Sequence, residues 1–326
     1  MTNVVITRSS GLPFPKHQPV KLSYTAGYAQ GADTLTYECG IFDKSDFDAK
    51  EEFTFEVTPG TGDKINFTGV LFDFPETADN RVRSLNFVSK YTIGLHSYLP
   101  LYGQGNLSNV LKACYRAADV LKTDIVPCDR DYDAVCFPRT MTTQEAITYL
   151  ERMALVDGNS YVATTIINDT AYGRNVCKGK QQISGVYYII EEIRDSRKYI
   201  DLGGGLSVDA LSDSIKLNKT SFTMKGTSLV VGKAFHTYES VIANKARTRV
   251  AQLKQYFKNY IARISQPGFQ LTVGNNFVVD ENDLYSKSDQ ARKQLLRGTY
   301  FIMAQELSVD FSRSMENTAS VLQKVA

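Results

Sequence analysis

Hydrophobic and polar residues alternate at strand spacing over the first hundred residues of the chain. Phe53, Phe55 and Val57 are separated by charged or polar neighbours, which is the period of a strand buried on one face. The segment 59–63, Pro-Gly-Thr-Gly-Asp, supplies a turn before the next apolar run. Because no helical period interrupts this pattern, it predicts a half-buried antiparallel sheet or barrel. Strands are expected at 20–28, 35–42, 53–57, 65–72 and 80–91.

The pattern changes to a helical period after residue 103. Asn106 or Ser108 is placed to cap the first turn, and the helix is expected to end near Thr123. A short strand should follow at 134–137, where Pro138 stops it. The apolar stripe of this helix recurs every three or four positions: Leu107, Val110, Leu111, Cys114, Ala118 and Leu121.

The sequence Thr-Thr-Gln-Glu at 142–145 predicts the start of a second helix. The Thr142 hydroxyl and the Glu145 carboxylate can each satisfy a backbone donor of the first turn, which forms a capping box. Ile147, Leu150 and Met153 would form the buried stripe, and a strand is expected at 160–167. This order of helices and strands predicts a compact α/β insertion.

The region from 183 to 231 returns to strand patterns. A strand is expected at 186–193, and a hairpin joins 222–224 to 228–231. The glycines at 203–205 are consecutive and lack the spacing of a phosphate-binding loop. We interpret that stretch as a flexible linker between domains.

The longest predicted helix covers residues 237–264 and ends before Pro267. An apolar stripe runs through it at helical spacing from Tyr238 to Ile264. Its other faces are basic, and two interpretations stay open: a solvated face, or a contact with an acidic partner. The candidate partner-contact face consists of Lys245, Arg247, Arg249, Lys254 and Lys258.

The last sixty residues again show clusters at strand spacing. Leu271 and Val273 begin the series, and Leu307, Val309 and Phe311 continue it. Short antiparallel strands in succession are the expected structure.

Length and composition describe an ordinary globular protein. The 326 residues are enough for two or three domains. The net charge of +2 is too small to indicate stable nucleic-acid binding. No stretch approaches the roughly 18 apolar residues that span a membrane, and the first ten residues lack the pattern of a signal peptide. Assembly in a cytoplasm without membrane insertion is therefore expected.

The sequence contains few candidates for catalytic or metal-binding residues. The 5 cysteines form no Cys-x-x-Cys pair, so buried free thiols are expected rather than a disulfide framework or a zinc site. His236, close to Glu239, is interpreted as a structural residue at a helix start. No nucleophile elbow or His-Glu-x-x-His motif occurs. The sequence therefore predicts no enzyme, no cofactor and no catalytic or metal-binding residue.

Two segments have a recognisable order of elements. Segment 136–162 contains Cys-Phe-Pro-Arg, a Thr-capped helix and a Gly-containing turn into a strand. Segment 268–326 contains a Val-Gly step between two strands, an insert, a Gly-Thr-Tyr-Phe-Ile strand, a polar bend and a terminal strand. Both segments resemble the baseplate hub proteins of contractile-tailed bacteriophages and the hub part of type VI secretion spike proteins. The stretch 195–267 departs from that pattern.

The resemblance implies an α+β fold of antiparallel tube-type β-barrels with an α/β insertion and one long helix. The first barrel is expected at 1–100, completed by 183–200. The insertion would cover 101–182, and the second barrel, which carries the long helix, 201–326.

The resemblance also implies the function of a structural virion protein in the tail baseplate. Three chains would form a ring that joins a sixfold tail tube to a threefold central spike and leaves a channel for DNA. The implied partners are two further copies, the spike, tube or tube-initiator proteins and baseplate wedge proteins, with DNA only in transit. Two alternatives stay open: a tail-tube or tube-initiator subunit, and a hydrolase or ligand-binding protein with its site between the β region and the insertion.

Overall fold

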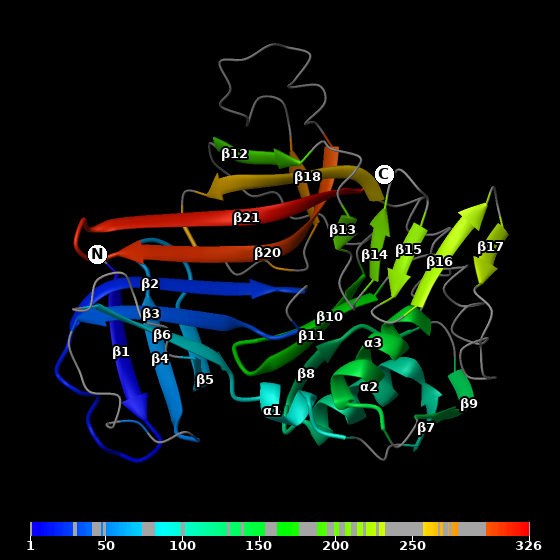
Figure 1. Ribbon diagram of the computed structural model, residues 1–326, viewed down its shortest axis with the longest axis horizontal. Coiled ribbons are helices and arrows are strands. Elements are labelled where there is room, and N and C mark those ends of the chain that lie inside the picture. Colours follow the sequence, from blue (N-terminus) through cyan, green and yellow to red (C-terminus); the bar gives the residue numbers. More distant parts are fainter. Residues whose placement is uncertain are drawn as a thin grey trace, which may run out of the picture.

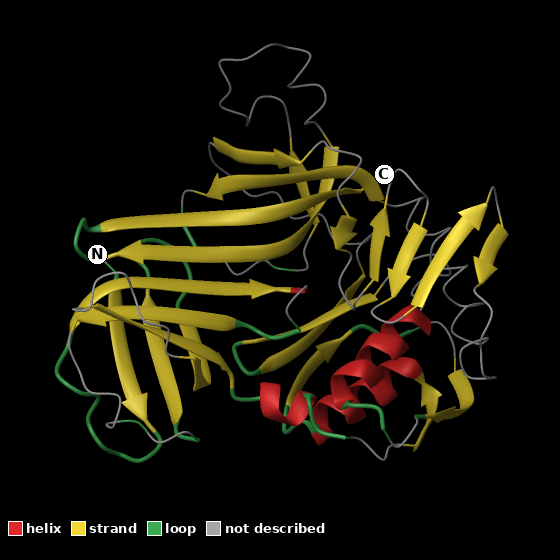
Figure 2. Ribbon diagram, in the orientation of Figure 1, coloured by secondary structure: helices red, strands yellow, loops and turns green. Residues whose placement is uncertain are grey.

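The computed structural model consists of one long curled antiparallel sheet, three smaller sheets and a group of helices (Figure 1, Figure 2). The structure describes residues 2–28, 31–40, 47, 50–73, 82–98, 102–128, 131–137, 140–153, 162–175, 188–193, 199–201, 206–209, 214–217, 220–225, 228–231, 257–266, 268–269, 273, 276–279 and 298–325.

The main sheet contains 11 strands, and each neighbouring pair is antiparallel. In spatial order the strands are β1 (Asn3–Arg8), β4 (Glu52–Thr58), β5 (Ile65–Asp73), β6 (Val82–Ser89), β3 (Thr34–Gly40), β2 (Gln18–Gly27), β20 (Gly298–Asp310), β21 (Met315–Val325), β18 (Phe257–Gln266) and β12 (Tyr188–Ile193), with β19 (Asn276–Val279) paired to β20. The strands expected in the first hundred residues are thereby confirmed, and so are those expected from Phe277 to the C-terminus. The strand expected at Leu271 and Val273 falls largely outside the described residues.

The smaller sheets contain strands of the middle region. They are β10 (Val162–Ile167), β11 (Thr170–Asn175) and β8 (Lys122–Ile125); β13 (Tyr199–Asp201), β14 (Leu206–Asp209), β15 (Ser214–Leu217), β16 (Thr220–Lys225) and β17 (Ser228–Val231); and β7 (Tyr102–Asn106) with β9 (Asp131–Cys136). The described helices are α1 (Thr92–Leu95), α2 (Leu107–Ala117) and α3 (Thr143–Met153).

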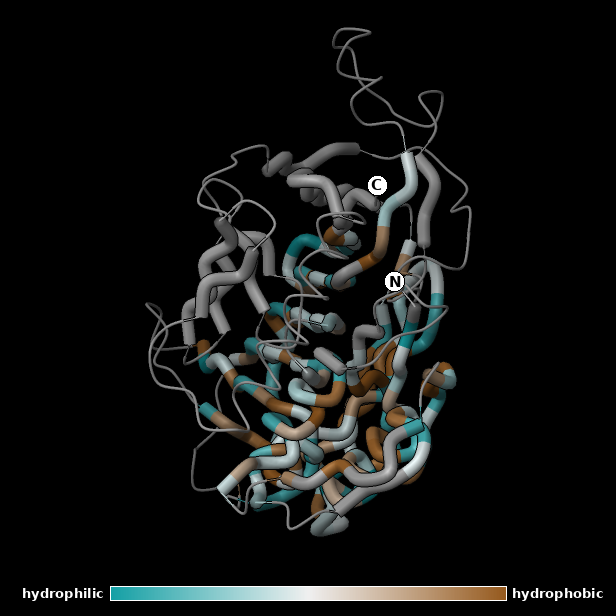
Figure 3. Tube along the Cα trace, turned by 90° about the vertical axis from the view of Figure 1, so that its right-hand side faces the viewer, coloured by the Kyte–Doolittle hydropathy of each residue, from teal (hydrophilic) through white to brown (hydrophobic). Residues whose placement is uncertain are grey.

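Alternation along strands β2, β3 and β4 produces much of the main core. Hydropathy changes from residue to residue along these strands (Figure 3), so that one row of each is apolar. Tyr24, Phe53, Phe55, Phe67 and Phe87 are each at most 1% exposed. Several of their rings meet edge to face, as Phe55 and Phe87 do with centroids 4.8 Å apart. Burial of these aromatic rings holds the curl of the sheet.

A second core lies between α2, α3 and the sheet of β8, β10 and β11. The predicted caps of both helices are confirmed. The Asn106 side chain accepts a hydrogen bond from the Ser108 amide at 3.1 Å. The Thr142 hydroxyl accepts from the Glu145 amide at 3.2 Å, and the Glu145 carboxylate accepts from the Thr142 amide at 3.0 Å. The α/β character expected for the insertion is therefore present.

Helix α2 ends earlier than predicted. Its last residue is Ala117, and Asp119 adopts a left-handed conformation with φ 64°. The amide of Asp119 donates to Arg116 and that of Val120 to Tyr115, which is the hydrogen-bond pattern of a Schellman C-cap. As a result, Leu121 leaves the predicted apolar stripe and is 80% exposed.

The helix predicted over 237–264 is wrong at its C-terminal end, because Phe257–Gln266 is strand β18. This strand pairs with β12 on one side and β21 on the other. Two ladders of backbone hydrogen bonds outweigh a helical period read from one segment alone. Lys258 lies within β18. The rest of the predicted helix, with Lys245, Arg247, Arg249 and Lys254, lies outside the described residues.

The main sheet runs across the predicted domain boundaries. Strand β2 pairs directly with β20, and β12, from the segment expected to complete the first barrel, pairs with β18. The predicted division into domains stays a prediction. The glycines at 203–205 lie outside the described residues, but the strands before and after them, β13 and β14, pair with each other. That pairing places a strand connection where the sequence suggested an interdomain linker.

A second contact joins the N-terminal region of the chain to its C-terminal region. The backbone around Gly62 forms a parallel bridge with Phe269, and the Phe269 carbonyl accepts a hydrogen bond from the Asp63 amide at 2.6 Å. Gly62 has φ +110°, and a Cβ atom there would lie 1.8 Å from the Phe269 carbonyl oxygen. Only glycine allows this approach.

We therefore predict that Gly62→Ala destabilises the protein by about 3 kcal/mol or more, through backbone strain and overpacking. Gly11→Ala is the matched control, because Gly11 also has positive φ but open space around its missing Cβ. The control should cost only about 1 kcal/mol. Urea unfolding of the two variants measures the difference, and equal losses would contradict the proposed close contact.

Candidate functional site

The face of the main sheet opposite its core is formed largely by small polar side chains. Leu22 and Tyr24 lie in the core, so Ser23 between them points to the other side. The strand register extends this face, since Ser23 pairs with Thr36 on β3 and with Ser308 on β20. We call it the polar sheet face. From β6 to β21 its three rows are Ser84, Glu38, Lys21, Asp310 and Met315; Asn86, Thr36, Ser23, Ser308 and Asn317; and Val88, Thr34, Thr25, Glu306 and Ala319.

Charge on the polar sheet face is sparse and mainly negative. Lys21 lies between Glu38 on β3 and Asp310 on β20, so carboxylates flank this lysine on both sides. A hydrogen bond from the Ser312 hydroxyl lowers the pKa of Asp310 and favours its charged form. Together with Glu306, three carboxylates outnumber one ammonium group, which leaves a net charge of −2 on the fifteen residues. A polyanion gains no net attraction from such a surface.

The insertion is fixed to the main sheet by the hairpin of β10 and β11. Its two turn residues, Asn168 and Asp169, have φ of 47° and 61°, as a tight two-residue hairpin requires. Ile167, at the end of β10, is 2% exposed and belongs to the core of the main sheet rather than to that of the insertion. The Thr165 hydroxyl donates to the Gly27 carbonyl at 2.9 Å. We call residues 167–170 the hairpin tip.

Backbone hydrogen bonds secure the same junction. The Ile166 amide donates to the Gly31 carbonyl at 3.0 Å, and the Asp33 amide donates to the Ile166 carbonyl at 3.1 Å. These bonds form a short parallel bridge between β10 and the segment that leads into β3. The Asn168 side chain also accepts from the Asn66 amide at 3.4 Å. The hairpin tip is therefore held by both backbone and side-chain contacts.

A buried carboxyl group lies at the centre of this junction. Asp33 is 3% exposed, and its Oδ2 accepts hydrogen bonds from the Tyr24 hydroxyl at 3.0 Å and the Asn168 amide at 3.3 Å. None of the ion pairs among the described residues involves Asp33. Burial raises the pKa of Asp33 to about 7, although both hydrogen bonds oppose that shift. This group could not be identified from the sequence, because the residues that contact it come from different segments of the chain.

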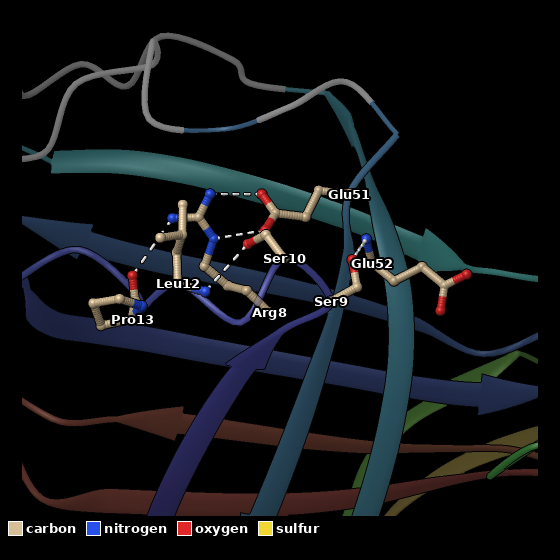
Figure 4. Close-up of polar contacts among 7 residues, drawn as sticks. All are labelled: Arg8, Ser9, Ser10, Leu12, Pro13, Glu51 and Glu52. Atoms are coloured by element: carbon tan, nitrogen blue, oxygen red, sulfur yellow. Dashed lines mark hydrogen bonds and ion pairs between the residues drawn. The ribbon is translucent and has the colours of Figure 1, made fainter.

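A second buried carboxylate lies under the N-terminal loop (Figure 4). Arg8 and Glu51 have side chains only 6% and 3% exposed, and two hydrogen bonds of 2.8 and 2.6 Å join them. The Ser10 hydroxyl also donates to Glu51. The Arg8 guanidinium lies 5.4 Å from the ring centre of Phe47 and 5.9 Å from that of Phe53. This pair anchors the loop after β1 to the end of the sheet.

The Arg8–Glu51 pair predicts a strongly non-additive effect on stability. Arg8→Met should cost about 3 to 5 kcal/mol because it leaves a buried carboxylate without its cation. The double variant Arg8→Met/Glu51→Leu should recover most of that loss. Lys64→Met is the control, since the Lys64–Glu56 pair is about half exposed and should cost less than about 1 kcal/mol. Additive losses in urea unfolding would contradict this role.

An open cleft of about 640 Å³ lies between the β region and the insertion. Its lining includes Glu52, Lys90 and Asp169, and the apolar side chains of Ile93 and Leu121 are largely exposed beside them. The position is the one expected for a ligand site in the hydrolase or ligand-binding alternative. The lining holds no histidine or cysteine, and Asp169 is paired with Lys90 at 3.9 Å. The hydroxyl of Ser97, which also lines the cleft, donates to the Ile93 carbonyl at 2.9 Å rather than to a basic side chain.

The predicted cysteine chemistry is confirmed where the structure describes it. Cys39, Cys114 and Cys128 are buried thiols, and burial raises the pKa of Cys39 and of Cys114 to about 12. Within the described residues, no group of acidic, histidine or cysteine side chains is arranged to hold a metal ion. The described helices also include none long and apolar enough to cross a membrane.

The candidate partner-contact residues are not brought together by the described structure. Lys258 is in β18, and the other four lie outside the described residues. The sequence did not identify the polar sheet face or the hairpin tip. Alternation in each strand was visible, but which strands lie side by side was not.

No protein-family model and no curated protein matches the chain. Solved structures do match it over nearly its whole length. The tail protein from Neisseria meningitidis MC58 is 11% identical, with a TM-score of 0.58 over 99% of this chain and 96% of that one. The 43 kDa tail protein of prophage MuSo2 from Shewanella oneidensis is 10% identical, with a TM-score of 0.59 and the same coverage.

A third similar structure comes from a secretion system. It is an Escherichia coli type VI secretion component described as structurally similar to the T4 bacteriophage tail proteins gp27 and gp5. It is 9% identical, with a TM-score of 0.54 over 99% of this chain and 77% of that one. At such identities the likeness establishes the fold alone. The chain has the fold of phage tail and type VI spike-related proteins, which confirms at the level of fold the resemblance noted in the sequence.

Proposed function

We propose that the chain is a structural tail protein, the central hub of a baseplate. Three copies would form a ring between a sixfold tail tube and a threefold central spike. The observation that carries this proposal is the similarity of fold to phage tail proteins over 99% of the chain. A ring of three requires a heterologous interface that closes on itself. The proposal also requires each chain to present two similar tube-type surfaces, so that three chains offer six to the tube.

The polar sheet face supports the channel that this proposal requires. DNA binds proteins chiefly through lysine and arginine contacts with phosphates. On this face Lys21 is flanked by Glu38 and Asp310, and its middle row is neutral from Asn86 to Asn317. Such a wall would let DNA pass without holding it. We therefore assign the polar sheet face to the inside of the ring, with the insertion and its cleft away from the channel.

The hub proposal predicts a threefold ring with an open centre. Negative-stain imaging of the purified chain, alone and with a spike trimer, tests this together with mass in solution. A sixfold ring would favour the tail-tube alternative instead. A chain that stays monomeric in both samples would contradict the hub and favour a ligand-binding protein that uses the cleft.

The channel assignment has a separate test. Ser23→Arg/Ser308→Arg places two positive charges side by side in the middle row and should make the rings bind double-stranded DNA in low salt, whereas the wild type does not. Binding should weaken steeply as salt rises. The control Asn109→Arg/Ala117→Arg adds equal charge at exposed positions of α2. DNA binding of equal strength in both variants would contradict the assignment.

A further inference from the structure

We propose that the hairpin tip is a proton-dependent latch, in which protonated Asp33 keeps the insertion docked on the main sheet and ionised Asp33 favours its release. The proposal concerns how the insertion is attached and does not depend on the hub function. It rests on the geometry of the junction, where one buried carboxyl group lies between the sheet and the tip.

The contacts of Asp33 show why it acts at both sides of the junction. Its own amide donates to Ile166 of β10, and its carboxyl group accepts from Asn168 of the tip. On the sheet side, the carboxyl group accepts from the Tyr24 hydroxyl of β2. Withdrawal of the tip would therefore break the bond from Asn168 and open Asp33 to water. An ionised carboxylate gains far more from that hydration than a neutral acid does.

The groups that face Asp33 do not neutralise its charge. From β2 it meets the Tyr24 hydroxyl, beside which lies Tyr172 of β11, and from the segment after β6 it meets Tyr91. From the tip it meets Asp169, a second carboxylate. The cation in this group, Lys90, is paired with Asp169 and not with Asp33. The buried carboxyl group therefore relies on hydrogen bonds from one hydroxyl and one amide.

The direction of the pH effect follows from burial. Burial at the junction raises the pKa of Asp33 from the 3.8 of a free aspartate to about 7. Exposure of the carboxyl group to water would move its pKa back towards the free value, so the docked state binds a proton more tightly than an open state would. Docking then weakens as pH rises from 3.8 towards 7, and the change ends above about 7. Because opening releases at most one proton, the opening constant changes by at most about tenfold per pH unit.

Hydrogen exchange of the full chain, corrected for the intrinsic pH dependence of exchange, measures this opening. In fragments that contain the Ile166 and Asn168 amides, the opening constant of the wild type should rise about tenfold per pH unit from pH 5 to 7 and then level off. Asp33→Asn keeps an acceptor for Tyr24 and Asn168 but carries no charge, and its opening should not change with pH. Asp119→Asn, the same change at an exposed aspartate outside the junction, should behave as the wild type.

Two further variants keep Asp33 and test its neighbours. Asp169→Asn removes a like charge while retaining a residue that tolerates positive φ, so the pH at which opening levels off should fall. Lys90→Gln removes the cation beside Asp169, so that pH should rise. Opposite shifts, together with a flat profile for Asp33→Asn, are the expected result. An Asp33→Asn profile that follows the wild type, or shifts of the same sign, would overturn the proposal.

Discussion

The pairing of β2 with β20 is the interaction on which the rest of the structure depends. Seven residue pairs, from Lys21 with Asp310 to Gly27 with Ala304, join the first strands of the chain to its last ones. Loop closure over such a separation is entropically costly, so the pairing forms only because it also completes a buried core. Leu307 and Val309 lie in the same cluster as Leu22 and Tyr24. The register of β2 with β20 therefore both continues the sheet and places the apolar side chains in the core.

That register also determines the surface of the sheet. Because side chains alternate along a strand, each residue that enters the core directs its neighbours to the opposite face. A shift of β20 by one residue would exchange Ser308 with a core leucine or valine. The polar sheet face is thus specified by the same constraint that specifies the core. A polar face of this kind needs no dedicated motif, because it requires only neutral residues and paired charges at the outward positions.

Much of the local structure could be predicted from the sequence, because local signals decide it. Alternation predicted the strands of the first hundred residues, and the Thr142–Glu145 capping box predicted α3. Residues 257–264 were misassigned because their apolar residues happen to fit a helical period, whereas the pairing of β18 with β12 and β21, which decides the structure, cannot be read from the segment itself. The end of α2 was missed because the left-handed Asp119 is not a glycine. The polar sheet face and Asp33 could not be predicted, since both depend on pairings between distant segments.

Two of the buried carboxylates, Glu51 and Asp33, differ in the groups that face their charge. Glu51 receives two hydrogen bonds from Arg8 and one from Ser10, so its negative charge is matched where it lies. Asp33 is as deeply buried but receives hydrogen bonds from neutral donors, Tyr24 and the Asn168 amide. Neutral donors reduce the cost of burying a charge without removing it. The Arg8–Glu51 ion pair therefore fixes the N-terminal loop, whereas in our proposal attachment of the insertion depends on a proton.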